Sequence, residues 1–247
     1  MNPVSQPPHI SPTPALYLIP VNLSDAPLQS VLPQYNLHLV RQLRYFIVEN
    51  VRTARRFLKA CDRSIDIDQI TFFELNTHTD PAAVPSYLEP LRGGEPVGVM
   101  SEAGCPAVAD PGALAVAEAQ RLGLKVVPLI GPSSILMGLM GSGFNGQGFT
   151  FHGYLPIEEG ARLARIRELE ADTQRTGRTQ IFIETPYRNN KMVDFLARTL
   201  RPTTMLCVAS GITDPQRESI LTRTAAAWRT ARYDYSKIPT IFLIGKN

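Results

Sequence analysis

The sequence has few cysteines and no long uninterrupted apolar run. Its three cysteines, Cys61, Cys105 and Cys207, are an odd number and show no CxxC spacing. This pattern argues against a disulfide framework and against a cysteine zinc site, and it favours a reducing compartment. No segment approaches the roughly 18 consecutive apolar residues that a transmembrane helix needs. We therefore expect a protein without a membrane span.

A strong excess of charge of either sign is also missing. The formal net charge is +3 and the pI is near 8.8. This mild balance argues against a protein that coats DNA, but it permits an anionic or nucleic-acid substrate. Twenty arginines stand against five lysines. Phosphate recognition and a codon bias of the source genome would both produce this ratio, so the count leaves both explanations open.

The first residues lack the pattern of a targeting segment. Residues 1–14 contain five prolines and no apolar run. We interpret them as a flexible tail that forms neither a signal peptide nor a membrane anchor, and we expect a cytoplasmic protein. With 247 residues, 44% of them hydrophobic, the chain is globular. It is long enough for one large domain or for two of about 100 to 150 residues.

A glycine-rich loop is absent after the first predicted strand. This strand, Ala15–Ile19, is followed by the loop Pro20–Asp25, which contains no glycine. A dinucleotide-binding Rossmann unit would place the pattern GxGxxG at this strand-to-helix turn. The sequence therefore argues against a dinucleotide-binding domain of that kind.

The most informative stretch runs from Val97 to Ser134. A short apolar strand, Val97–Met100, leads into a loop of small residues and then into an alanine-rich helix, Ala113–Leu122. Gly123 lies where a helix stop is expected, and Leu124–Ile130 is predicted as a second buried strand. Loops rich in glycine and serine follow both strands, and such loops let backbone donors approach a ligand at the carboxyl edge of a sheet. This edge is the first candidate site.

The rest of the first half alternates strands and helices. Further strands are predicted at Tyr45–Val48 and Ile70–Leu75, and further helices at Leu28–Leu43 (interrupted by Pro33), Val51–Ala60 and Pro85–Leu91. This alternation predicts a largely parallel sheet with helices on both faces. Asn50 is expected to cap the helix that follows it, and that helix carries a basic face. The basic face consists of Arg52, Arg55, Arg56 and Lys59, and a simply solvated helix face stays open as an alternative to a binding surface.

After Ser134 the pattern changes, because strands now follow one another as well as helices. The predicted strands are Phe149–Tyr154, Thr179–Glu184, Met205–Ala209, Glu218–Thr222 and Thr240–Ile244, and the predicted helices are Ile135–Met140, Glu158–Arg175, Asn189–Leu200 and Ala225–Ala231. Adjacent strands mixed with helices predict a mixed sheet. We therefore expect two α/β domains: an N-terminal one over 15–130 and a C-terminal one over 131–247, with the boundary near Leu129 to Pro132.

Several spaced motifs carry a resemblance to a known family. SEAGCPAVADPG is followed in order by VVPLIGPSS, FTFHGYLP and IFIETPYR. Together they resemble the tetrapyrrole methylase superfamily, the class III S-adenosylmethionine-dependent methyltransferases, from about Leu16 to Ile244. The chain is most similar to the branch of ribosomal RNA small-subunit methyltransferase I-like enzymes, which methylate a ribose 2′-hydroxyl. The resemblance implies two α/β domains with S-adenosylmethionine in a cleft between them, a homodimer, and no metal.

Several motifs depart from the pattern of that branch. After the first strand IPVNLSD replaces TPIGNLxD, and Glu49–Arg52 reads ENVR instead of EDTR. Ser101–Pro106 reads SEAGCP instead of SDAGTP, and Glu184–Arg188 reads ETPYR instead of ESPHR. The GPGD-type loop of the tetrapyrrole branch is absent. The donor side is better matched than the acceptor side, so three hypotheses stay open: an RNA methyltransferase, a methyltransferase for a tetrapyrrole or other small molecule, and a cofactor-binding dimer without catalysis.

The resemblance also implies which residues bind the methyl donor. Small residues at these positions let backbone groups contact the cofactor. The implied cofactor-binding residues are Pro20, Ser101, Glu102, Ala103, Pro106, Ser133, Ser134, Glu184 and Gly211. Helix capping is a further role for the serine pair, and capping of the helix at Pro186 is an alternative role for Glu184.

The acceptor chemistry needs a base, because a ribose hydroxyl is a poor nucleophile at neutral pH. Candidate groups on predicted strand-end loops are Glu49, Glu102, Asp110 and His152; structural roles in a turn for Asp110 and in the core for His152 stay open. We select Glu102 together with Arg52 as catalytic. Cys105 is interpreted as a small buried residue, because no histidine or aspartate is placed to activate it. The arginines within Arg52–Arg56 and Arg162–Arg167 suggest an RNA substrate.

Overall fold

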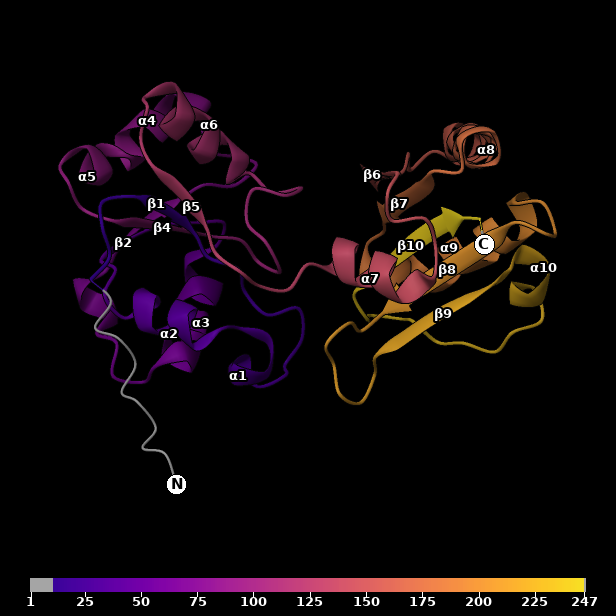
Figure 1. Cartoon of the computed structure of the whole chain (residues 1–247), viewed down its shortest axis with the longest axis horizontal. Coiled ribbons are helices and arrows are strands. Elements are labelled where there is room, and N and C mark those ends of the chain that lie inside the picture. The colour runs from indigo at the N-terminus through magenta and orange to yellow at the C-terminus, as the bar shows by residue number, and fades with distance from the viewer. Residues whose placement is uncertain (1–10, 247) are drawn as a thin grey trace. The chain divides into compact units, whose positions relative to one another are not determined.

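The computed structural model describes residues 11–246, which form two compact units (Figure 1). The first contains 11–22 and 27–132, and the second contains 23–26 and 133–246. The units therefore divide between Pro132 and Ser133, and a four-residue segment of the first loop, Leu23–Ala26, belongs to the second unit. Residues 1–10 of the predicted tail lie outside the described residues.

The first unit is built on a five-stranded sheet. Its strands are β1 (Leu16–Leu18), β2 (Tyr45–Val48), β3 (Thr71–Glu74), β4 (Val97–Met100) and β5 (Val126–Pro128). All neighbours pair in parallel, in the order β3-β2-β4-β1-β5, which confirms the predicted parallel sheet. A strand forms within Leu124–Ile130 as predicted, but its expected burial and length are wrong: β5 is an edge strand of three residues, Val126 and Val127 are half-buried, and Pro128 is exposed.

Helices cover both faces of this sheet, as predicted. They are α1 (Leu28–Val31), α2 (Gln34–Val40), α3 (Val51–Cys61), α4 (Val84–Tyr87), α5 (Glu89–Arg92) and α6 (Ala113–Arg121), with 3₁₀ turns at Ile67–Gln69 and Pro81–Ala83. Pro33 divides the expected helix over Leu28–Leu43, because the residue before a proline is driven out of the helical region; Leu32 is extended, with φ −119° and ψ 137°. Asn50 caps α3, and its side chain accepts hydrogen bonds from the backbone N–H groups of Arg52 (2.9 Å) and Thr53 (3.3 Å).

The sheet of the second unit is mixed, as predicted. Its strands are β6 (Phe149–Tyr154), β7 (Thr179–Ile183), β8 (Met205–Ser210), β9 (Ser219–Thr224) and β10 (Thr240–Gly245), in the order β6-β7-β10-β8-β9. β6 and β7 are parallel, whereas β10 is antiparallel to β7 and β8, and β9 is antiparallel to β8. The carboxyl ends of β6, β7 and β8 therefore lie on the edge of the sheet where β10 begins.

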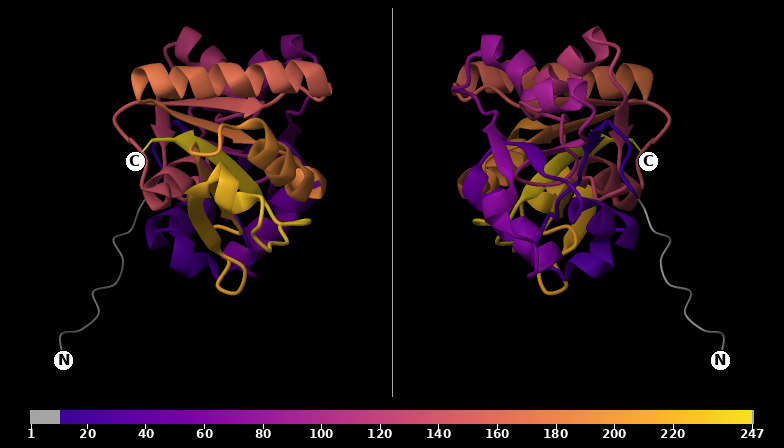
Figure 2. Two further views of the ribbon diagram at one scale, coloured as in Figure 1. Left: turned by 90° about the vertical axis from the view of Figure 1, so that its right-hand side faces the viewer. Right: turned by 90° about the vertical axis from the view of Figure 1, so that its left-hand side faces the viewer.

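Two apolar cores cover the faces of the mixed sheet. The helices are α7 (Ser134–Ser142), α8 (Glu159–Thr176), α9 (Asn189–Thr199) and α10 (Ala225–Trp228), with a 3₁₀ turn at Pro186–Arg188. α8, seen side-on in Figure 2, packs on β7 and β10. α7 packs on β8, β9 and β10 through a second core that includes Leu139, Cys207 and Ile241. No helix within residues 11–246 combines the length and apolar character that a membrane span requires.

Candidate functional site

Three loops meet at the carboxyl edge of the first sheet. In the loop after β1, Val21 forms a two-way backbone bridge with Gly104 of the loop after β4, with N–H···O distances of 2.9 and 3.2 Å. The loop after β5 contacts both. A Cβ on Gly131 would overlap the Pro20 ring, lying 2.6 Å from its Cγ, and the Cys105 thiol donates to the Pro132 carbonyl at 3.4 Å. β4 and β5 both flank β1, so the first candidate site is assembled from all three loops.

The loop after β4 is turned by residues with positive φ. Gly104, Ala107 and Ala109 have φ values of 69°, 65° and 54°. The Asp110 carboxylate accepts hydrogen bonds from the backbone N–H groups of Ala107 (3.0 Å) and Gly112 (2.7 Å). The structure therefore gives Asp110 the turn-stabilising role that the sequence left open.

The donor-binding residues implied within this edge differ in exposure. Glu102 and Ala103 are exposed, Ser101 is half-buried, and Pro20 and Pro106 are buried. The Ser101 hydroxyl donates to the Ala103 carbonyl at 3.2 Å. Glu102 and Ala103 thus present their side chains to solvent, whereas the two prolines pack within the loops.

Carboxylates gather where β2 and β4 end. Val48 pairs with Met100, so Glu49 and Ser101 leave the sheet side by side. The Thr53 hydroxyl of α3 donates to the Glu102 carboxylate. Burial, followed by the charges of Asp110 and Glu102, raises the pKa of Glu49, and the Glu102 backbone N–H partly offsets this rise. The ionised form of Glu49 is therefore disfavoured at this edge.

Arg52 does not pair with the carboxylate that we selected beside it. Its side chain is exposed and forms no ion pair within residues 11–246, while Glu102 is bonded to Thr53. Glu102, in the loop after β4, reaches the first turn of α3 through Thr53, but among the described residues no hydrogen bond or ion pair joins it to Arg52.

The remaining implied donor residues lie in the second unit. Glu184 and Gly211 follow β7 and β8, so both lie on the edge where β10 begins. Glu184 is buried, and its Oε1 accepts from the Arg188 guanidinium at 2.7 and 3.0 Å and from the Thr185 N–H at 2.6 Å. These contacts give it a role in holding the turn at Pro186. Gly211 has φ 61°, and a Cβ there would lie 2.7 Å from the Arg217 carbonyl oxygen.

The serine pair begins α7. Ser133 is the N-cap residue, and its hydroxyl accepts from the Leu136 N–H at 3.5 Å. Ser134 is the first helical residue. Capping is therefore observed for Ser133, which is compatible with anion or polar-ligand binding at the same helix start.

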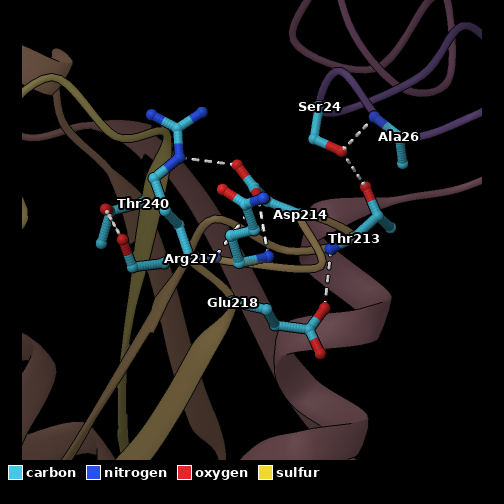
Figure 3. A network of polar contacts seen from close by, with 9 residues as sticks. Ser24, Ala26, Thr213, Asp214, Arg217, Glu218 and Thr240 are labelled. Carbon is cyan, nitrogen blue, oxygen red and sulfur yellow. Dashed lines mark hydrogen bonds and ion pairs between the residues drawn. The ribbon is translucent and has the colours of Figure 1, made fainter.

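One polar network of the second unit was missed in the sequence. Thr213, in the turn after β8, has φ 71°, and its N–H donates to the Glu218 carboxylate at 2.7 Å (Figure 3). Its hydroxyl lies 3.0 Å from that of Ser24. The contact joins positions 189 apart in sequence, so no local spacing could have indicated it; the polar run NLSD after the first strand was the only signal.

One prediction about a polar side chain is wrong. His152 does not lie on a strand-end loop but within β6, where its Nε2 lies 2.7 Å from the Gln180 amide oxygen and its Nδ1 3.0 Å from the Arg165 guanidinium. Within the Arg162–Arg167 segment two arginines are already engaged, because Arg165 also pairs with Glu168 and Arg162 stacks on the Phe195 ring, 4.6 Å from its centroid. Both arginines anchor α8 within its unit.

The cysteines are poor nucleophiles. Burial raises the pKa of Cys61 to about 12 and that of Cys207 to about 11, and it also raises the pKa of Cys105. Cys105 is half-buried, not buried as the sequence suggested, and its thiol donates to the Pro132 carbonyl, which fits a packing role. Within residues 11–246 no cluster of three or more histidine, cysteine, aspartate or glutamate residues is arranged to hold a metal ion.

Comparison with known proteins identifies relatives and fold neighbours, although no family model matches. The ribosomal RNA small subunit methyltransferase I of Mesorhizobium japonicum is 36% identical over 178 residues, which are 71% of this chain and 55% of that protein. The protein of the same name from Xylella fastidiosa is 30% identical over 193 residues, 78% of this chain and 67% of that protein. The chain thus spans between about half and two thirds of the length of these curated relatives.

Solved structures share the fold. The methyltransferase CobJ superposes with a TM-score of 0.61 at 14% identity, covering 94% of this chain and 93% of that one. The cobalamin biosynthetic enzyme CbiF, a cobalt precorrin-4 methyltransferase, superposes with a TM-score of 0.56 at 15% identity, covering 94% and 95%. The chain shares its two-unit α/β fold with these methyltransferase structures, and by its similarity to the curated relatives it belongs to the ribosomal RNA small subunit methyltransferase I family.

Proposed function

We propose that this protein is an S-adenosylmethionine-dependent methyltransferase that acts on RNA, at a ribose 2′-hydroxyl of ribosomal RNA. The observation that carries the proposal is the carboxyl edge of the first sheet, where the loops after β1, β4 and β5 contact one another in a chain of this family. Ligands of open α/β sheets bind at this edge.

The residues at this edge suit the methyl donor. Ser101, Glu102 and Ala103 follow β4 and offer a hydroxyl, an exposed carboxylate and accessible backbone. Together with Pro20 and Pro106 they would hold the donor on the first unit. On the second unit the proposed positions are Ser133, Ser134, Glu184 and Gly211. When bound, the donor supplies an electrophilic methyl group, and the protein contributes alignment and exclusion of water.

The acceptor step requires a group that takes up a proton. The hydroxyl oxygen forms a bond to the methyl carbon, the pair of electrons of the carbon–sulfur bond remains on sulfur, and the proton leaves the oxygen. We propose that Glu102 accepts this proton and that Arg52 stabilises the developing negative charge. The hydrogen bond from Thr53 would orient the Glu102 carboxylate for this role.

The basic face of α3 supports an RNA substrate. Arg52, Arg55 and Arg56 are exposed and form no ion pair within the described part of the chain. Unpaired arginines contact phosphates at lower cost than paired ones, since no carboxylate must be displaced. Lys59, by contrast, donates to the Arg63 and Ile65 carbonyls at 3.1 and 2.6 Å, so it is already engaged.

We also propose a homodimer in a reducing, cytoplasmic environment. Leu136 and Met140, one helical turn apart on α7, are 51% and 82% exposed, as is suitable for an interface. Three free thiols suit a reducing compartment. Light scattering of the purified protein would measure the dimer directly.

Incubation with methyl-labelled S-adenosylmethionine and total RNA from a strain lacking the protein tests the activity. We expect label in the small-subunit ribosomal RNA, at a nucleotide whose phosphodiester resists alkali because its 2′-hydroxyl is blocked. Label confined to a small-molecule fraction would favour the tetrapyrrole-type hypothesis. Donor binding without transfer to any extract would favour a cofactor-binding dimer.

The proposed RNA contacts of α3 can be tested through the salt dependence of RNA binding. Replacing Arg52, Arg55 and Arg56 with glutamine should weaken RNA binding and flatten the dependence of log K on log salt by about 2, since each phosphate contact in single-stranded RNA contributes a slope of about 0.7. The matched control replaces three exposed arginines that are paired with carboxylates, Arg92, Arg121 and Arg175. Equal salt slopes for the two triple variants would contradict an RNA-binding role for α3.

A further inference from the structure

The loop after β1 is shared between the two units. Val21 is fixed in the first unit by its backbone bridge to Gly104. Leu23–Ala26 belongs to the second unit, where Leu23 packs against the core under α7. Only Asn22 and Leu23 separate the bridge from Ser24. Two residues of the chain therefore join the bridged part of the loop, which includes Pro20 and Val21, to the part that contains Ser24.

Ser24 forms hydrogen bonds that hold this segment in place. Its hydroxyl accepts from the Ala26 N–H at 3.2 Å and lies 3.0 Å from the Thr213 hydroxyl. Figure 3 shows the two hydroxyls facing each other, with Thr213 on the turn that follows β8. The contact holds a tight turn of the first loop against the second unit.

Thr213 is held in a conformation that is costly for its residue type. A β-branched residue at positive φ is a steric outlier, and such outliers persist only where their surroundings over-determine them. Here the Glu218 carboxylate accepts the Thr213 N–H at 2.7 Å. Asp214 braces the turn: its N–H donates to the Gly211 carbonyl at 2.8 Å, and its carboxylate accepts from the Gln216 N–H at 3.0 Å and the Arg217 Nε at 2.7 Å.

Hydrogen bonds also connect this turn to the end of β8 and to the start of β10. The Gly211 N–H donates to the Pro239 carbonyl at 2.9 Å, and the Thr240 and Ser210 hydroxyls lie 2.9 Å apart at the start of β10 and the end of β8. The Thr213 hydroxyl is thus presented from a rigid turn that contains Gly211, one of the implied donor-binding residues.

We propose that Thr213 is a positioning residue for methyl-donor binding: through Ser24 it holds the loop after β1 in the conformation that receives the donor. The inference rests on the proposed use of S-adenosylmethionine. Without the contact the loop must be ordered when the donor binds, and that entropy is subtracted from the binding free energy. The pair therefore acts on donor affinity, whereas the rate of transfer from the bound donor changes less.

Binding of S-adenosylhomocysteine to the full chain, measured by calorimetry, tests the proposal without turnover. Ser24→Ala and Thr213→Val should each weaken binding by about 3- to 10-fold, the range expected for one neutral hydrogen bond. Thr213→Ser keeps the hydroxyl and should restore the wild-type affinity. The double variant should bind no more weakly than Ser24→Ala, because Ser24→Ala already removes the Ser24–Thr213 contact, together with the Ala26 hydrogen bond, and Thr213→Val removes only the former. Thr230→Val, which removes an exposed hydroxyl bonded to the Ala227 carbonyl, is the control.

The readouts separate this inference from the proposed function. Unchanged affinity in Ser24→Ala and Thr213→Val, or failure of Thr213→Ser to restore it, overturns the positioning role, and so does a wild-type chain that does not bind the probe. If the affinities change as expected but no RNA is labelled, the positioning role stands and the RNA activity fails. With an active enzyme, the same variants should raise KM for S-adenosylmethionine more than they lower kcat.

Discussion

Gly131 permits the close contact between the loops after β1 and β5. A Cβ at this position would overlap the Pro20 ring, which is itself buried. We expect Gly131→Ala to lower the free energy of unfolding by about 1 to 3 kcal/mol, as overpacking does, and to weaken S-adenosylhomocysteine binding. Gly146→Ala is the control, since a Cβ there meets nothing within 4 Å. Thermal denaturation of the two variants measures the difference, and equal melting temperatures would contradict the tight contact.

The Glu49 carboxylate makes the stability of the folded chain depend on pH. Its pKa in the folded chain is raised above the unfolded value of 4.5, mainly by burial and then by Asp110 and Glu102. The folded state therefore binds the proton more tightly, and stability is lost as pH rises from 4.5 through the folded pKa. Glu49→Gln should have a higher melting temperature than the wild type at pH 7, with the difference shrinking toward pH 4.

Glu118 is the control for this measurement, because its pKa is shifted in the opposite direction. The Arg121 guanidinium lowers the pKa of Glu118, so Glu118→Gln should give no stabilisation at pH 7. A Glu49→Gln variant that is no more stable than the wild type at pH 7 would show that the ionised Glu49 carboxylate does not destabilise the folded chain.

At the level of elements, a buried carboxylate joins α8 to the turn between α9 and β8. Glu170 is 6% exposed, and it accepts hydrogen bonds from the Arg201 N–H (2.9 Å) and the Thr204 hydroxyl. Glu170→Ala leaves the buried Thr204 hydroxyl without this acceptor and also removes the acceptor of the Arg201 N–H, so we expect a loss of about 1 to 3 kcal/mol in the free energy of unfolding by urea. Glu168→Ala, on the exposed face of the same helix, should change it by less than about 1 kcal/mol. Similar losses in both variants would contradict a special role for Glu170.

Some boundaries of helices and strands can be predicted from local sequence patterns alone. Pro33 and Asn50 act on their own neighbours, so the break between α1 and α2 and the start of α3 follow from sequence. The short length and partial burial of β5 do not follow from sequence. β5 lies at the edge of the sheet, and this position leaves Val126 and Val127 half-buried. His152 lies inside the strand Phe149–Tyr154 that the sequence itself predicted, so local pattern was enough to exclude a strand-end loop; its contacts with Gln180 and Arg165 were not predictable.

At the scale of the whole molecule, each unit has hydrophobic cores of its own. The single tryptophan, Trp228, is buried in the second unit and donates to the Leu206 carbonyl at 2.9 Å. Tryptophan fluorescence therefore reports the second unit, whereas far-ultraviolet circular dichroism reports both. We expect the two denaturation curves not to coincide, and we expect Glu170→Ala to shift the fluorescence curve by more than the dichroism curve. Coincident curves in both proteins would show that the chain unfolds as one cooperative unit.

The sequence by itself determined the order of strands and helices, the parallel and mixed sheets, and the family, because hydrophobic periodicity, capping residues and ordered motifs are all local signals. It also placed the loops after β4 and β5 at one sheet edge. Only the tertiary structure decided which side chains meet there. It paired Glu102 with Thr53 and left Arg52 apart, engaged Arg165 with Glu168 and His152, and brought Ser24 to Thr213. Contacts between residues far apart in the chain depend on how the elements pack, and no spacing within one segment encodes them.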